Sequence, residues 1–171
     1  MEVTKAAHTE ATPRRTHGVY SWIQNYRVAN GVKVYAGAFT GLPGANALTS
    51  KRGYLILWQD QSTIIWTGMA IGQSATNSLS TSNAVVGDTS ASPVPEVSVE
   101  CGPIVLEQAS VTGVSAQTDV GRTAVYASND NDMTTTSSTY ANAIGHVLYW
   151  HSGTTADVFI FGFQTQLGSL L

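Results

Sequence analysis

Charged residues are scarce in this sequence. Lysine, arginine, aspartate and glutamate make up 11% of its 171 residues, whereas ordinary soluble domains contain roughly 25%. Mixed surface charges normally keep a small domain dispersed, so this composition suits a protein that packs against neighbours. The eight Lys and Arg residues are scattered and are outnumbered by eleven carboxylates. Since no basic stripe is available to neutralise phosphates, we expect no nucleic-acid partner.

Cysteine and long apolar runs are also nearly missing. Cys101 is the only cysteine, which excludes an internal disulfide, and no Asn-x-Ser/Thr sequon occurs. The first residues lead into a polar stretch without the apolar core of a secretory signal. The densest apolar runs, Tyr54–Trp58 and Val158–Phe163, are too short to span a bilayer. We therefore expect a protein that stays out of membranes and is made and used without passing through an oxidising compartment.

Signatures of catalysis are absent as well. The sequence has no phosphate loop ending in Gly-Lys-Ser/Thr, no Gly-x-Gly-x-x-Gly and no His-Glu-x-x-His. Residues Gly113–Gln117 begin like a Gly-x-Ser-x-Gly nucleophile elbow but lack the final glycine and the strand-to-helix context. The sequence offers no convergent acid, base and nucleophile. We predict that the protein is not an enzyme and takes no cofactor and no small-molecule substrate.

The pattern that is present is apolar alternation with a period of two, which predicts an all-β fold. Residues 20–28 alternate as a strand. Asn30-Gly31 then favours a type I′ turn, and this predicts a hairpin with residues 32–35. A second hairpin is predicted between Tyr54–Trp58 and Thr63–Trp66. With 43% apolar residues and a net charge of −3, the chain suits one folded domain, and we expect a small antiparallel β-barrel or sandwich-like body.

The C-terminal third is the most regular part. Glu96–Cys101 alternates cleanly, and Ile144–His151 pairs with Asp157–Phe163 in a predicted hairpin. The latter strand is apolar on both faces, with its three phenylalanines on one and Val158 and Ile160 on the other. Both faces of such a strand must be covered, either inside a barrel or at a subunit interface. The interface candidates are Phe159, Phe161, Phe163 and Trp150.

Two segments do not look like parts of a core. Residues 1–18 form a polar arm without apolar period, which we interpret as a strap that orders on a partner. Residues 72–95 are rich in Ser, Thr, Asn and Ala and read as a long loop or insertion. The remaining chain, residues 19–171, is predicted to be a single β domain that includes this loop.

Three carboxylates are candidates for a calcium site. Asp130 and Asp132 alternate with asparagines, and Asp119 precedes them. The EF-hand template needs Gly and Glu where this sequence has Thr135 and Ala141. Turn capping by Asn and Asp explains the run better, so no metal is predicted, although an irregular calcium site remains an alternative.

The histidines do not suggest a metal site either. His146 and His151 lie five residues apart in one strand, so their side chains are expected on opposite faces. His151 and Asp157 face each other across the predicted hairpin and can form a dyad, but no nucleophile accompanies them. The aromatic residues offer a further alternative, a stacking platform for sugars. Its candidate members are Trp22, Trp58, Trp66, Trp150, Tyr20, Tyr26 and Tyr149.

Three blocks in their order resemble the head-decoration (capsid cement) proteins of tailed bacteriophages. That family has a D-x-G-x-x-V-Y-A-x-D run followed by threonines, a closing segment of the form hIGhVhxhxSGTxhxV in which h is apolar, and an earlier G-hxhYxGxhV hairpin. The matching blocks here are Val114–Arg122 with Val125–Asp130 and Thr134–Thr136, Ala143–Trp150 with Ser152–Thr154 and Ala156–Val158, and Val32–Ala38. Together they cover about half of the chain.

The resemblance implies a non-enzymatic β-barrel body that binds the outside of an expanded phage head as a homotrimer, assembled in the host cytoplasm. The major capsid protein would be its partner. We expect the arm and the 72–95 loop to make that contact, because they carry many hydrogen-bonding groups and little charge. The capsid-contact candidates are Lys5, Arg14, Arg15 and His17. The alternative function is a carbohydrate-binding tip or spike domain that uses exposed aromatic rings.

Overall fold

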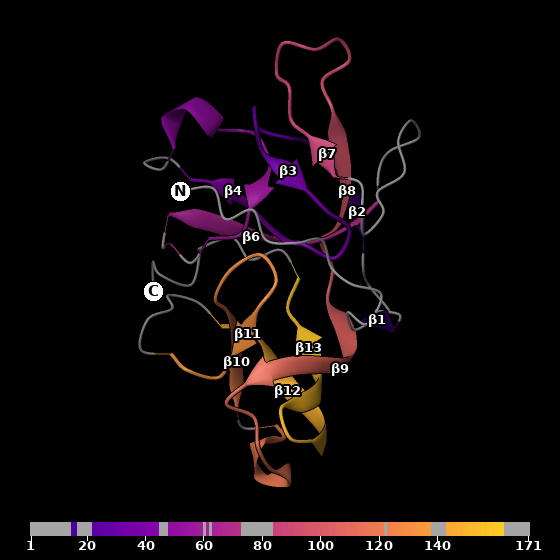
Figure 1. Ribbon diagram of the computed structural model, residues 1–171, viewed down its shortest axis with the longest axis vertical. Coiled ribbons are helices and arrows are strands. Elements are labelled where there is room, and N and C mark those ends of the chain that lie inside the picture. Colours follow the sequence, from indigo (N-terminus) through magenta and orange to yellow (C-terminus); the bar gives the residue numbers. More distant parts are fainter. Residues whose placement is uncertain are drawn as a thin grey trace.

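The fold is all-β, as the alternating pattern predicts, with 53% of the structure in strands and 4% helical. The computed structural model describes residues 15–16, 22–44, 48–59, 61, 63–72, 84–121, 123–137 and 143–162. The helical elements in this part of the chain are two single turns, η1 (Thr49–Lys51) and η2 (Gln117–Asp119). The strands form two bodies stacked along the long axis of the molecule (Figure 1). We call them the N-terminal lobe (residues 22–101) and the barrel (residues 102–162).

Five strands close the barrel in the order β9-β11-β10-β12-β13. Their bounds are β9 (Ile104–Thr112), β10 (Ala124–Ala127), β11 (Met133–Thr134), β12 (Ala143–Ser152) and β13 (Thr155–Ile160). β13 pairs back onto β9, so the sheet has no open edge between its first and last strands. All pairs are antiparallel except β11 with β9. The short strand β1 (Arg15–Thr16) joins the same edge of β9 as β11, opposite Val105 and Leu106.

The inward residues of the barrel fill its interior completely. They are almost all aliphatic and no more than 3% exposed, as expected for a small barrel whose side chains meet at the axis. They include Leu106, Ala109, Val111, Val125, Ala127, Val147, Ala156, Val158 and Ile160. The barrel core is therefore complete without any residue from its outer face.

The N-terminal lobe is a five-stranded sheet in the order β2-β8-β6-β4-β5. Its strands are β2 (Ile23–Arg27), β4 (Phe39–Pro43), β5 (Ile56–Leu57), β6 (Ile64–Gly72) and β8 (Glu96–Glu100). A parallel bridge between Val28 and Leu55 links the two outer strands at one end, so this sheet is also curled. A two-stranded sheet of β3 (Lys33–Val34) and β7 (Val85–Val86) lies beside it (Figure 1).

The hairpin predicted around Asn30-Gly31 is wrong in its pairing. The chain does reverse there, with Val32 N–H donating to the carbonyl of Ala29 at 3.0 Å, but the turn is not of type I′, because φ is positive at Gly31 (+73°) and not at Asn30. However, β2 pairs with β8 and β3 pairs with β7. The Gly31 N–H donates to the carbonyl of Gly87 at 2.9 Å, so a distant segment holds the turn. A turn signal fixes where the chain reverses, but not which strand it meets.

The second predicted hairpin is also wrong, because β4 inserts between its two strands. Thr40 pairs with Leu57 on one side, and Gly41 pairs with Trp66 on the other. Gly41 lies within β4, where the neighbouring strand leaves little room for a side chain. A Cβ at Gly41 would lie 2.5 Å from Ile64 Cγ2. The glycine marks a close approach between strands and not the end of one.

The segment predicted as a loop at residues 72–95 is partly ordered sheet. Its residues 73–83 lie outside the described part, but Val85–Val86 form β7 and Gly72 ends β6. Residues 87–95 then make an exposed turn that projects from the end of the lobe (Figure 1). In the C-terminal third the prediction is confirmed. β8 buries Val97 and Val99, and β12 and β13 form the expected hairpin.

Two buried tryptophans join the lobe to the barrel. Trp58 Nε1 donates to the carbonyl of Ala127 at 3.0 Å, and Trp66 Nε1 donates to the carbonyl of Phe161 at 3.3 Å. The two indoles meet edge to face with ring centroids 5.2 Å apart, and Phe39 lies 5.3 Å from Trp66. Because a buried indole N–H needs a partner, each bond fixes how the barrel sits under the lobe.

Replacing Trp58 with phenylalanine should lower the free energy of unfolding by about 1–3 kcal/mol, because the indole donor to Ala127 is lost within a buried site. Equilibrium unfolding in urea measures this change. The matched control is Trp22→Phe, since Trp22 is 51% exposed and should change stability by less than about 0.5 kcal/mol. Equal transition midpoints for the two variants would contradict this account of the junction.

Candidate functional site

The outer face of the barrel carries large apolar side chains that its core does not need. Phe159 on β13 lies in register with His146 on β12 and with Val105 on β9. Phe161 follows just beyond the end of β13, and its ring centroid is 5.1 Å from that of His146 and 6.0 Å from that of Phe159. We call Phe159, Phe161 and His146 the outer aromatic row. Phe159 and Phe161 are only half-buried in this chain.

The predicted division of the last strand into two faces is confirmed for its described residues. Val158 and Ile160 point into the barrel and are almost fully buried, whereas Phe159 and Phe161 are on the outside. Phe163, the third predicted member of the interface, lies outside the described residues.

A pair of β-bulges interrupts the barrel at the level of Asp157. On one side, Glu107 and Gln108 of β9 both face this single residue, because Leu106 pairs with Val158 and Ala109 pairs with Ala156. On the other side, Val147 pairs with Val158 and Tyr149 pairs with Asp157, so Leu148 is the extra residue. Bulges recur where a strand must redirect a side chain, and they are often found beside functional sites.

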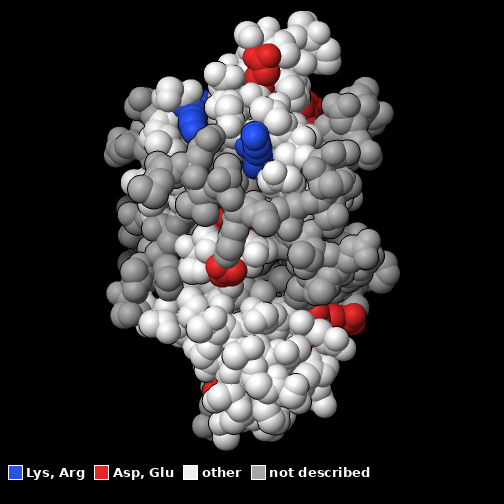
Figure 2. Space-filling view, in the orientation of Figure 1, with Lys and Arg blue, Asp and Glu red and all other residues white. Residues whose placement is uncertain are grey.

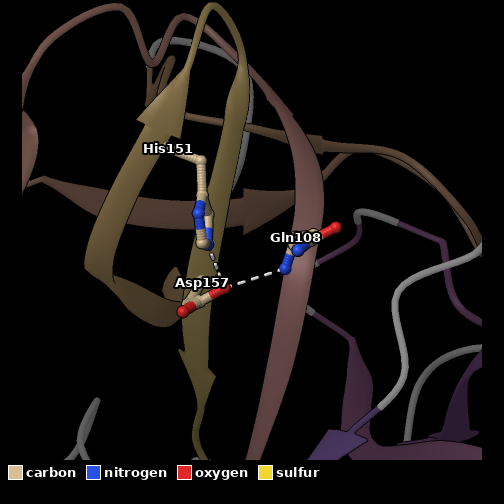
Figure 3. Close-up of polar contacts among 3 residues, drawn as sticks. All are labelled: Gln108, His151 and Asp157. Carbon is tan, nitrogen blue, oxygen red and sulfur yellow. Dashed lines mark hydrogen bonds and ion pairs between the residues drawn. The ribbon is translucent and has the colours of Figure 1, made fainter.

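The Asp157 carboxylate links the β9 bulge to a further bulge of β12 at His151, which lies between the pairs Trp150–Ala156 and Ser152–Thr155 (Figure 3). Its Oδ1 accepts the backbone N–H of Gln108 at 2.8 Å and lies 2.8 Å from His151 Nε2. Since an ionised carboxylate only accepts hydrogen bonds, Nε2 is the nitrogen that donates. Gln108 has a φ of +52°, a conformation that L residues rarely adopt, and the bond to Asp157 offsets part of that strain. The His151–Asp157 contact predicted across the hairpin is confirmed.

The expectation that His146 and His151 lie on opposite faces is wrong. Both side chains are on the outside of the barrel, His146 against Phe161 and His151 against Asp157. The extra residue Leu148 shifts the alternation by one position between them. Side chains alternate between the two faces of a strand only where no bulge interrupts the alternation.

The same bulge leaves two consecutive large side chains in solvent. Leu148 is 45% exposed and Tyr149 is 53% exposed. The Tyr149 ring meets His151 at a tilted angle of 66°, with ring centroids 4.8 Å apart. Trp150 behaves differently, because its ring packs partly against the core and its Nε1 donates to the carbonyl of Gly153 at 3.0 Å. Trp150 thus closes the β12–β13 turn, and its predicted place in a subunit interface stays a prediction.

Charge divides the described surface unevenly. All four Lys and Arg side chains that the structure describes, Arg27, Lys33, Lys51 and Arg52, belong to the N-terminal lobe. The described part of the barrel carries only carboxylates, among them Glu107 and Asp157. In the view of Figure 2, blue side chains occur only on the lobe. The described side chains on the outer face of the barrel therefore include carboxylates and histidines but no Lys or Arg.

Of the calcium candidates, Asp119 caps a turn, and in the turn that holds Asp130 and Asp132 the capping residue is Asn129. Asp119 Oδ2 accepts the N–H groups of Ser115 and Ala116 at 2.8 and 3.0 Å, and these bonds hold the pKa of Asp119 below its usual value. In the other turn, Asn129 Oδ1 accepts the N–H groups of residues 131 and 132, while Asp130 is buried. Among the described residues, no group of three His, Cys, Asp or Glu side chains is placed to hold a metal ion.

The aromatic residues do not form one platform. Trp58 and Trp66 are core residues. The Tyr26 hydroxyl lies 3.7 Å from Cys101 Sγ, and burial, followed by this hydrogen bond, raises the pKa of Tyr26. Trp22 is exposed but belongs to the lobe, and Tyr20 lies outside the described residues. Tyr149 is the platform candidate on the barrel whose ring is mainly in solvent.

Most predicted capsid contacts lie outside the described part of the chain. Lys5, Arg14 and His17 are not among the described residues. Arg15 belongs to β1, where its backbone pairs opposite Leu106 of β9. These assignments stay predictions.

Compared with known protein families, curated proteins and solved structures, the chain matches none of them. In the described part of the chain, no helix has the length and apolar character required to cross a bilayer. The function of the chain is therefore inferred from the geometry of the barrel surface and from the order of the motifs in the sequence.

Replacing Asp157 with alanine should lower the free energy of unfolding by about 1–3 kcal/mol, because the Gln108 N–H and the His151 ring both lose their acceptor. Urea unfolding again measures the effect. Glu107→Ala is the matched control, since Glu107 is an exposed carboxylate in the same bulge and should change stability by less than about 0.5 kcal/mol. If Asp157→Ala unfolds at the wild-type urea concentration, Asp157 does not hold the bulges together.

Proposed function

We propose that this chain is a decoration protein of a tailed-phage head, which binds the outer surface of the expanded capsid and bridges its capsomers. The observation that carries the proposal from the structure is the outer aromatic row on a barrel whose core is already full. The order of the family-like motifs in the sequence supports it independently. The proposal includes no chemical reaction, and the protein works by binding alone.

Burial of the outer aromatic row is best achieved between copies of the chain. Phenylalanine side chains on the outside of a closed barrel gain free energy when another surface removes them from water. The surface around them has few charges to desolvate, which favours association. We propose a cyclic trimer in which Phe159 and Phe161 lie at the subunit contacts, joined by Phe163 and Trp150.

A trimer suits attachment to a capsid because three weak contacts act together. When three arms match the spacing of sites on a shell, avidity exceeds single-site affinity by roughly 10²–10⁴. We propose that the arm, residues 1–18, binds the major capsid protein, with Lys5, Arg14, Arg15 and His17 pairing with polar or acidic groups. The exposed turn at residues 87–95 is the second proposed contact.

Replacing Phe159 with serine should convert the trimer to monomers, because it removes apolar area from each subunit contact. Light scattering coupled to size-exclusion chromatography measures the mass, and urea unfolding checks that the barrel remains folded. Val86→Ser is the control, since Val86 is 49% exposed but lies in the lobe. A wild-type chain that stays monomeric at high concentration would rule out the trimer.

Removing residues 1–14, which leaves β1 in place, should abolish cosedimentation with empty expanded heads of the source phage. The full-length chain should sediment with expanded heads and not with unexpanded ones. Thermal unfolding of the shortened chain should match the full-length protein, because β1 and the barrel are retained. Unchanged binding without residues 1–14 would exclude the arm contact, and failure of the full-length chain to bind expanded heads would exclude the decoration function.

A further inference from the structure

We propose that the surface around Asp157 and Tyr149 binds a neutral hexose of a glycan chain. This inference goes beyond the proposed decoration function and does not depend on it. The site is built from three adjacent strands of the barrel, with Tyr149 and His151 on β12, Asp157 on β13 and Gln108 on β9.

Tyr149 supplies the apolar part of the site. Its ring is 53% exposed and points away from a core that is complete without it. The His151 ring contacts it at a centroid distance of 4.8 Å and an interplanar angle of 66°. A pyranose ring has an apolar face of C–H groups, and an exposed aromatic face in water is a suitable surface for it.

The polar part of the site lies directly beside that ring. Both hydrogen bonds of Asp157 use Oδ1, which leaves Oδ2 to accept from a sugar hydroxyl, and Figure 3 shows this oxygen pointing away from Gln108 and His151. Because His151 donates through Nε2, its Nδ1 is an acceptor in the neutral ring. The exposed side-chain amide of Gln108 adds both a donor and an acceptor. Sugar hydroxyls, which donate and accept, match this set.

The charge around the site selects the class of glycan. The nearest charged groups are the carboxylates of Asp157 and Glu107, and the described part of the barrel presents no Lys or Arg side chain. An anionic ligand such as a sulfated or uronic-acid polymer would meet the like charge of these two carboxylates. A neutral hexose has no such penalty.

The two bulges make this site rigid before any ligand arrives. Asp157 connects the β9 bulge to the β12 hairpin through Gln108 and His151, so the acceptor and the ring are held in one relative position. Ligand binding then orders few side chains, which favours weak but specific recognition.

Titration with neutral oligosaccharides tests the proposal. Maltohexaose, cellohexaose and chitohexaose are added to the full-length protein labelled with ¹⁵N, and amide shifts are followed by NMR. We expect at least one of them to bind with a Kd of about 1 mM and to shift the amides of Gln108, Tyr149, His151 and Asp157. A heparin hexasaccharide should shift none of these amides.

Tyr149→Ala should weaken that binding at least about tenfold, whereas Tyr149→Phe should retain it, because the ring and not the hydroxyl makes the contact. Trp22→Ala is the matched control, since Trp22 is exposed to the same degree on the lobe, and it should bind like the wild type. The proposal is overturned if no neutral oligosaccharide binds at about 10 mM, if Tyr149→Ala binds normally, or if Trp22→Ala loses binding. Head cosedimentation of Tyr149→Ala should be unchanged, so the glycan site and the decoration function can fail separately.

Discussion

Closure of the barrel is the constraint on which the rest of the structure depends. Once β13 pairs with β9, every interior position is surrounded by five strands and is filled by aliphatic side chains. Side chains on the outer face of the barrel are then not needed to fill its interior. The half-buried phenylalanines and the exposed tyrosine of this face leave apolar surface in contact with water, while the Asp157 carboxylate accepts the N–H of the strained Gln108.

Sequence reasoning worked where neighbours in the chain are also neighbours in space. The β12–β13 hairpin was predicted because its two strands flank one short turn, and this also brought His151 and Asp157 together. In the N-terminal lobe the strand pairing was predicted wrongly, because the partner of β2 lies some seventy residues away in β8. No local signal specifies that choice, since many strands of similar composition compete for each edge.

The finer geometry of the candidate site was hidden for a different reason. The extra residue Leu148 shifts the alternation of side chains in β12, and a second bulge at His151 shifts it again. Neither the type of these residues nor their neighbours in the sequence predict a bulge. The left-handed backbone conformation of Gln108 could not be predicted from the sequence either, because glycine or asparagine usually occupies that conformation. Only the pairing of the three strands shows that both irregularities meet at Asp157, so the polar half of the site could not be predicted.

The attachment of β1 has a mechanical consequence. Only two residue pairs, Arg15 with Leu106 and Thr16 with Val105, connect this strand to β9, whereas β9 is secured to β13 by five pairs and belongs to a ring without ends. Tension applied through the first fourteen residues would thus peel β1 away long before the ring opened. The contact of β1 with β9 is thus expected to break first, while the barrel stays folded and can pair with β1 again.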